Sequence, residues 1–168
     1  TSAAGFKVQR VIKLFGHIGG DEAELALEDV YVEPWQVVGE LNQGFGAALY
    51  GVSLGRIYNS ARAVGYGRWA VELALEYAST REAFGSAIAD FQATQFKLAD
   101  MLTELVAARQ MVRLAASKLD NKDPNASTYC AMAKRFATDV GFKICNDALQ
   151  LFGGYGYIKE YPMERHVR

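Results

Sequence analysis

Few side chains in this sequence have the types and spacing of a self-contained catalytic or metal site. The two histidines are His17 and His166, and neither follows a glutamate by three positions. A di-iron site in a helical bundle needs Glu-x-x-His pairs on facing helices, so the sequence argues against one. A Ser-His-Asp triad is disfavoured because the histidines fall at a predicted strand end and near the end of the chain. We therefore expect neither metal ligation nor acyl-enzyme chemistry.

The two cysteines, Cys130 and Cys145, fall within one predicted helix. A helix rises 1.5 Å per residue, so the two lie ~22 Å apart. That separation is beyond the reach of a disulfide. We expect two buried thiols that act as small hydrophobic side chains.

Arginine, glutamine and glycine residues at predicted helix ends are the remaining candidates. Arg81 follows one long helical segment, and Gln150, Gly153 and Gly154 lie at the end of another. A guanidinium suits pyrophosphate and sugar oxygens, but a helix-end arginine commonly binds the last carbonyls instead. Glycines permit close backbone approach to a ligand, but they also end helices as ordinary C-caps. The residues alone leave both interpretations open.

Composition and charge limit the partners. The 168 residues are 51% hydrophobic, and 18 basic and 19 acidic side chains give a net charge of −1. This balance disfavours nucleic-acid binding, which needs a basic surface. We find no apolar run long enough to span a membrane and no signal-peptide layout, so we expect an intracellular protein without membrane insertion. The chain begins without methionine and stops in a predicted helix, and we expect it to be part of a longer protein.

The first forty residues are predicted to form β structure. Apolar and polar residues alternate over residues 6–14 with the period of a half-buried strand. A second alternating segment starts at Ala23, changes phase after residues 28–29 as at a bulge or bend, and is closed by Pro34. Two strands alone are marginal in water. We interpret residues 1–40 as the remnant of a middle β-domain.

The rest of the chain has the period of helices. We expect helices over about residues 44–79, over 90–120 with Asp90 as N-cap, and from the polar break at 120–124 to Gly153, with a fourth starting at Tyr161. The fold class is therefore mainly α: an up-down antiparallel bundle, an incomplete four-helix bundle over residues 41–168, preceded by two β-strands.

Glycines are unusually frequent in the first predicted helix. Each costs up to ~1 kcal/mol relative to alanine in an exposed helix. We attribute them to close approach by a neighbouring helix, with a ligand as the alternative. They are Gly46, Gly51, Gly55, Gly65 and Gly67.

Two longer motifs carry a family resemblance. Residues 76–102 hold an Arg-x-x-Phe-Gly turn between two helices, and residues 148–165 hold a Gln-x-x-Gly-Gly segment followed by a new helix. Both resemble the acyl-CoA dehydrogenases, and they stand at the separation found in that family. Residues 24–34 and 39–45 are similar to the end of the family's middle β-domain, so the resemblance spans nearly the whole chain.

The resemblance implies an FAD enzyme that desaturates acyl-CoA thioesters. In the family, a glutamate removes the α-proton while the β-hydrogen leaves as hydride to the flavin. The C-terminal domain contacts the FAD of a neighbouring subunit. By this resemblance the cofactor-binding residues are Arg81, Phe84, Gln92, Gln150, Gly153 and Gly154.

The resemblance also implies a coenzyme A contact on the first helix. The family has an Asp-x-x-Arg segment there, and this chain has Ser53-Leu54-Gly55-Arg56. Arg56 matches the pattern and Ser53 departs from it, because a serine can hydrogen-bond but brings no carboxylate. Arg56 and Ser53 are the expected substrate-binding residues.

The family's catalytic base has no counterpart in these residues. Most members carry it in a Glu-Gly-Thr segment that would follow residue 168, and a minority carry it just before the first-helix arginine, where this chain has Gly55. We interpret Glu160 and Glu164 as structural or solvent-facing. We expect no catalytic residue within this chain and no dehydrogenase activity from the chain alone.

The resemblance implies several partners. They are an acyl-CoA substrate, electron-transfer flavoprotein as acceptor, and copies of the chain in a homodimer or homotetramer, in bacterial cytoplasm or the mitochondrial matrix. Two other interpretations stay open. One is a related flavin enzyme on the same scaffold, such as an acyl-CoA oxidase or a flavin hydroxylase, and the other is a helical oligomerisation module without chemistry.

Overall fold

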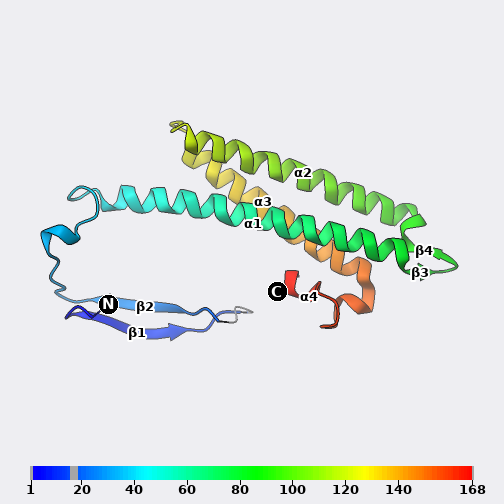
Figure 1. Cartoon of the computed structure of the whole chain (residues 1–168), viewed down its shortest axis with the longest axis horizontal. Coiled ribbons are helices and arrows are strands. Elements are labelled where there is room, and N and C mark those ends of the chain that lie inside the picture. Colours follow the sequence, from blue (N-terminus) through cyan, green and yellow to red (C-terminus); the bar gives the residue numbers. More distant parts are fainter. Residues whose placement is uncertain (1, 16–18, 168) are drawn as a thin grey trace. The chain divides into compact units, whose positions relative to one another are not determined.

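The computed structural model describes residues 2–15 and 19–167, so His17 lies outside the described residues. The chain divides into two compact units, one that ends at Ala48 and one from Leu49 to Val167. Figure 1 shows paired strands in the first unit and long helices in the second. Helix α1 (Gly44–Thr80) begins in the first unit and continues through the second.

The first unit contains an antiparallel hairpin of β1 (Phe6–Ile12) and β2 (Glu22–Leu27). Cross-strand ion pairs include Arg10 Nε to Glu24 Oε2 at 2.7 Å, and such exposed pairs contribute little stability. Leu25 and Leu27 are more than half exposed. The hairpin therefore encloses no core by itself.

The strands of the structure are shorter than the predicted ones. The register shifts between Val8 and Arg10, so the irregularity of the sheet itself lies in β1. The bend predicted at residues 28–29 is confirmed: it directly follows the end of β2, and Asp29 takes a positive φ of 50° there. A 3-10 turn, η1 (Pro34–Gln36), follows where the sequence placed the end of β structure.

The second unit is helical, which confirms the predicted fold class. After α1 come α2 (Gln92–Asp120), α3 (Ala126–Phe152) and the short α4 (Glu164–Val167). A small hairpin of β3 (Glu82–Ala83) and β4 (Ser86–Ala87) joins α1 to α2 through η2 (Ile88–Asp90). A further 3-10 turn, η3 (Gly153–Gly156), continues α3.

The start of α2 differs from the prediction. Asp90 lies in η2, and the N-cap is Phe91, whose side chain cannot cap. The backbone carbonyl of Phe91 instead accepts hydrogen bonds from Thr94 N at 2.9 Å and Gln95 N at 3.1 Å. The aromatic residue takes a position that capping rules assign to a polar one.

The core of the second unit is built largely from small side chains. Successive turns of α1 bury Ala70, Ala74 and Ala78 completely, and α3 does the same with Ala133 and Ala137. Small residues let helix backbones approach closely, and larger side chains fill the remaining space. These are mainly Met101, Leu105, Ile144, Phe152 and Met163. The cysteines are buried and unpaired, as predicted.

Helices α1 and α3 approach each other closely at a glycine. A Cβ on Gly141 would lie 2.9 Å from the carbonyl oxygen of Ala63, and one on Gly67 would meet Leu105 Cδ1 at 3.1 Å. The predicted packing role therefore holds for Gly67. Beside Gly46, Gly51, Gly55 and Gly65 no described atom lies within 4 Å of an added Cβ, so a packing role for these four stays a prediction.

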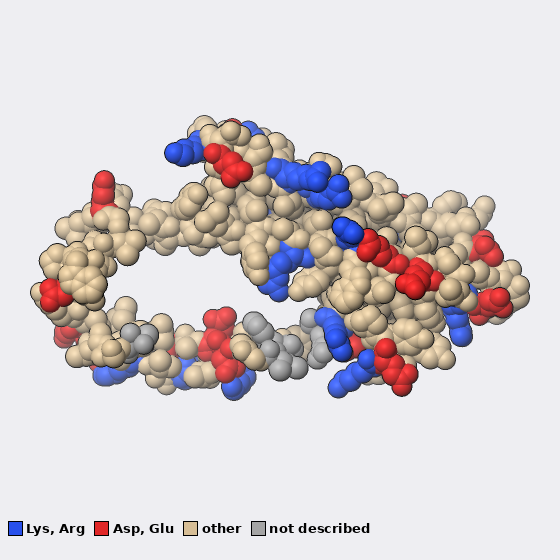
Figure 2. Space-filling model, viewed as in Figure 1, with Lys and Arg blue, Asp and Glu red and all other residues tan. Residues whose placement is uncertain are grey.

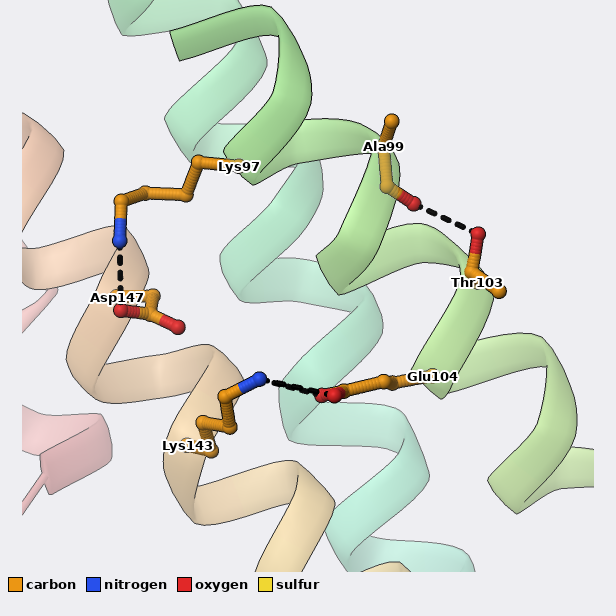
Figure 3. Close-up of polar contacts among 6 residues, drawn as sticks. All are labelled: Lys97, Ala99, Thr103, Glu104, Lys143 and Asp147. Carbon is orange, nitrogen blue, oxygen red and sulfur yellow. Dashed lines mark hydrogen bonds and ion pairs between the residues drawn. The ribbon is translucent and has the colours of Figure 1, made fainter. Parts of the chain in front are cut away.

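Two ion pairs join α2 to α3 along one side (Figure 3). Lys97 Nζ lies 2.9 Å from Asp147 Oδ1, and Lys143 Nζ lies 2.8 Å from Glu104 Oε1. Each helix supplies one lysine and one carboxylate, so the pairs favour one antiparallel register. Glu104 also raises the pKa of Lys143.

Candidate cofactor-binding site

Two adjoining hollows lie where α1 ends beside the end of α3. Their volumes are about 440 and 430 Å³, and both are lined by Tyr77, Arg81, Phe152 and Tyr155. The second is also lined by Gly153 and Gly154. The fold thus brings together Arg81 and the Gly-Gly segment, two motifs that lie about seventy residues apart in the sequence.

Arg81 is positioned by the end of α1. Its backbone N–H donates to the Tyr77 carbonyl at 2.8 Å, and its own carbonyl accepts from Ile88 N at 2.8 Å. Its guanidinium carbon lies 5.6 Å from the centre of the Tyr155 ring. Within residues 2–15 and 19–167 the Arg81 side chain makes no hydrogen bond or ion pair, so its donors are open to a ligand.

The Gly-Gly segment offers open backbone beside the same hollow. Gly153 has a φ of 57°, a conformation that side chains rarely adopt, and its N–H donates to the Gln150 carbonyl. No described atom lies within 4 Å of a Cβ added to Gly153 or Gly154. A ligand can therefore approach this backbone closely.

Phe84 lies at the tip of the β3–β4 hairpin. Phe84 and Gly85 form its two-residue turn, and both have positive φ, 54° and 83°, as in a type I′ turn. Such a φ is strained for a bulky residue. The Phe84 side chain is also 99% exposed. Its only ring contact among the described residues is an edge contact with Phe91, with centres 6.5 Å apart.

The two predicted glutamines lie near this site without lining either hollow. Gln92 is the exposed first residue of α2, directly after Phe91. Gln150 is exposed on the last turn of α3, one turn before Gly153. The structure places both at the same end of the helical unit as Arg81, on neighbouring elements.

The predicted substrate residues lie elsewhere on α1. Arg56 and Arg81 are twenty-five positions apart, which is ~37 Å along a helix, so the structure does not bring them together. Arg56 Nη1 lies 3.5 Å from Ser127 Oγ. Ser53 is buried and donates to the Leu49 carbonyl at 3.2 Å, and it lines a separate hollow of about 700 Å³ that also contains Lys122.

Ser53 also occupies a Gly-x-Ser-x-Gly segment, residues 51–55. In hydrolases this pattern marks a nucleophile on a sharp strand-to-helix turn. Here the segment lies inside α1, and the hydroxyl is hydrogen-bonded to its own helix. The pattern is therefore not a nucleophile elbow.

Cys130, Cys145 and His166 lie outside the linings of both hollows. Burial raises the pKa of the Cys145 thiol to about 11 and also raises that of Cys130. Burial and Arg165 lower the pKa of His166, which packs edge-on against Trp69 with ring centres 4.4 Å apart. In the described part of the chain no three His, Cys, Asp or Glu side chains form a potential metal site.

Sequence reasoning missed the aromatic residues of the site. Tyr77, Phe152, Tyr155 and Tyr161 make mutual ring contacts beside Arg81. The available signal was Tyr155 itself, which directly follows the Gly-Gly pair. Because glycines have no side chain to fill the space beside them, the side chain of the next residue lines the hollow.

Comparison with known proteins decides the family. The acyl-CoA dehydrogenase C-terminal domain matches residues 42–168. The chain belongs to the acyl-CoA dehydrogenase family. Its mainly helical fold is the one expected for that domain.

Relatives of this acyl-CoA dehydrogenase domain include enzymes of different names. A mitochondrial isobutyryl-CoA dehydrogenase of Dictyostelium discoideum is 46% identical over 86% of this chain and 35% of that protein. The caffeyl-CoA reductase-Etf complex subunit CarC of Acetobacterium woodii is 43% identical over 91% of this chain and 40% of that protein. The butyryl-CoA dehydrogenase structure of Megasphaera elsdenii has a TM-score of 0.87 and 37% identity, over 99% of this chain and 43% of that one. The chain thus spans 35 to 43% of the length of these relatives.

Proposed function

We propose that this chain serves as the C-terminal part of a longer FAD-dependent acyl-CoA dehydrogenase. One observation carries the proposal: Arg81, without an acidic partner among the described residues, lines both hollows, and the open Gly153-Gly154 backbone lines the second of them. Family membership supplies the prior expectation of a flavin. Figure 2 shows basic and acidic side chains interspersed on the face of the helical unit that it draws.

The residues present fit FAD. The Arg81 guanidinium would bind the pyrophosphate through its planar fork of donors. Backbone N–H groups at Gly153 and Gly154 would meet phosphate or ribose oxygens. Phe84 would lay its exposed ring against the cofactor, and Gln92 and Gln150 would donate or accept at its polar edges. When bound, the flavin would supply the hydride acceptor.

A neighbouring subunit would hold most of that FAD. The strained and almost fully exposed Phe84 supports this arrangement, because burial against a second copy would repay the exposure of a large ring. We propose a homodimer or homotetramer in which Arg81, Phe84 and the Gly-Gly segment reach across the interface.

The acyl-CoA would lie near the first third of α1. Arg56 would bind a coenzyme A phosphate or carbonyl, and Ser53 would contribute less, because its hydroxyl is already bonded within the helix. The reaction would be desaturation of the thioester, with the base outside these residues. Electron-transfer flavoprotein is the proposed acceptor, a choice favoured by the name of the CarC relative.

The proposed compartment is bacterial cytoplasm or the mitochondrial matrix, since relatives include Bacillus subtilis and mitochondrial proteins. No helix in the described ranges is long and apolar enough to cross a membrane.

The test is an absorption spectrum of the protein that carries this chain, followed by anaerobic titration with straight and branched acyl-CoAs. Flavin bands that are bleached by one thioester support the proposal and identify the substrate. Bleaching that is reversed rapidly by oxygen points to an oxidase instead. A protein that takes up no FAD, even when FAD is added, contradicts the proposal.

A further inference from the structure

Tyr155 is the one described residue that contacts the Arg81 side chain through a ring. The guanidinium carbon lies 5.6 Å from the ring centre, within the range of a cation–π attraction. This contact uses no N–H group of Arg81 and leaves the donors free. The long arginine side chain is otherwise without a described hydrogen bond that would fix its rotamer.

The Tyr155 ring is itself held by the core. It lies 5.4 Å from the Tyr161 ring, which contacts Phe152 at 5.6 Å and Tyr77 at 6.0 Å. Tyr77 and Phe152 stack at 4.2 Å with an interplanar angle of 19°. Because Phe152 is 4% exposed, the ring cluster connects Tyr155 to fixed structure.

The backbone of Tyr155 is constrained on both sides. Gly153 takes its positive φ two residues before it. Gly156 follows directly, and a Cβ there would lie 2.5 Å from the Leu149 carbonyl oxygen. This close approach holds the turn against α3. The backbone at Tyr155 is therefore constrained, whereas the Arg81 guanidinium is at the end of a long, flexible side chain from another part of the fold.

We propose that Tyr155 is a positioning residue that pre-orients the Arg81 guanidinium toward the anionic part of the flavin cofactor. The proposal rests on the proposed function. An arginine already confined over a ring loses less conformational freedom when it binds a ligand than a free one does. Tyr155 thereby couples the Gly-Gly segment to the arginine of the other motif.

The test measures the FAD dissociation constant and the thermal midpoint of Tyr155→Leu in the full protein. A part-exposed cation–π contact corresponds to about a two- to fivefold change in affinity. We expect a weakening of that size with the thermal midpoint of the apoprotein nearly unchanged. Tyr157→Leu is the matched control, because Tyr157 is 87% exposed and makes no described ring contact, and it should bind FAD normally.

A second pair of variants separates ring electronics from packing. Tyr155→Phe should retain wild-type affinity, whereas replacement of Tyr155 by a ring-trifluorinated phenylalanine keeps the shape and weakens the attraction, so FAD should bind more weakly. In an Arg81→Ala background, Tyr155→Leu should have no further effect. This pair answers the question even if Tyr155→Leu folds poorly.

Unchanged affinity in both Tyr155→Leu and the fluorinated variant, with normal FAD binding by the unsubstituted protein, would overturn the positioning role alone. An effect of Tyr155→Leu that persists fully without Arg81 would also overturn it. Failure of the unsubstituted protein to bind FAD would overturn the proposed function together with this inference.

Discussion

Gly141→Ala should destabilise the helical unit although alanine is the better helix former. The added Cβ would lie 2.9 Å from the Ala63 carbonyl oxygen and 3.1 Å from its Cβ. Neither atom is the end of a flexible side chain, so α1 and α3 must move apart. Overpacking of this kind costs about 1–3 kcal/mol, and the propensity gain of alanine over glycine offsets about 1 kcal/mol. We expect a net loss of about 1 kcal/mol.

Gly65→Ala is the matched control. Gly65 lies in α1, and no described atom lies within 4 Å of its added Cβ. This variant should therefore keep the propensity gain, about 0.5–1 kcal/mol. The two variants should differ by about 2 kcal/mol in the free energy of unfolding, or about 4–8 °C in thermal midpoint for a domain of this size.

Urea unfolding followed by far-ultraviolet circular dichroism measures this difference. Equal stability of the two alanine variants would refute the close α1–α3 crossing. A gain in stability at Gly141 would do so more strongly.

Three further predictions concern the loop, the thiols and the hairpin. A hydrogen bond from Lys118, with a further one from the Asn125 amide, lowers the pKa of Asp123. The stabilising effect of the ionised carboxylate should be complete above the unfolded pKa of about 3.9 and should vanish as the pH falls through the lower folded pKa. Urea titrations of wild type and Asp123→Asn should therefore converge in acid. Cys145, with a pKa of about 11, should react with a chromogenic disulfide reagent at mildly alkaline pH only after unfolding, and fast labelling of the folded chain would contradict its burial. Phe84→Asn should relax the positive-φ turn and leave the thermal midpoint equal or higher, while lowering flavin retention by tenfold or more if the ring covers the cofactor; retained flavin would argue against that role.

The helices of the second unit were predictable because their signals are local and long. Seams of apolar residues at helical spacing and the polar break before Ala126 need no knowledge of the fold. The start of α2 was not predictable in the same way. Capping rules favoured Asp90, but η2 occupies that position and the helix starts at Gln92. Tertiary context decides which carbonyl accepts the first hydrogen bond of the helix.

The glycines of α1 show the same limit. Frequency alone suggested packing for all of them, yet only Gly67 is close to another helix within the described structure. Which face of a helix meets a neighbour depends on the partner's path.

The candidate site was predictable by resemblance rather than by physics. Arg81, Gly153 and Gly154 were identified from motifs, and the structure adds that they line adjoining hollows. The contact of Arg81 with Tyr155 was not predictable, because the two residues lie on separate elements and meet only after α1 and α3 pack. The roles of these residues remain predictions.

The most direct test of the central claim compares flavin binding by Arg81→Ala and Arg68→Ala. Both remove an arginine of the α1 region, but Arg68 is exposed and paired with Glu72 at 2.8 Å, away from the hollows. We predict that Arg81→Ala weakens FAD binding by at least about tenfold, as expected for loss of a charge-assisted contact, and that Arg68→Ala binds like wild type. Equal flavin affinity in the two variants would contradict the assignment of this site to the cofactor.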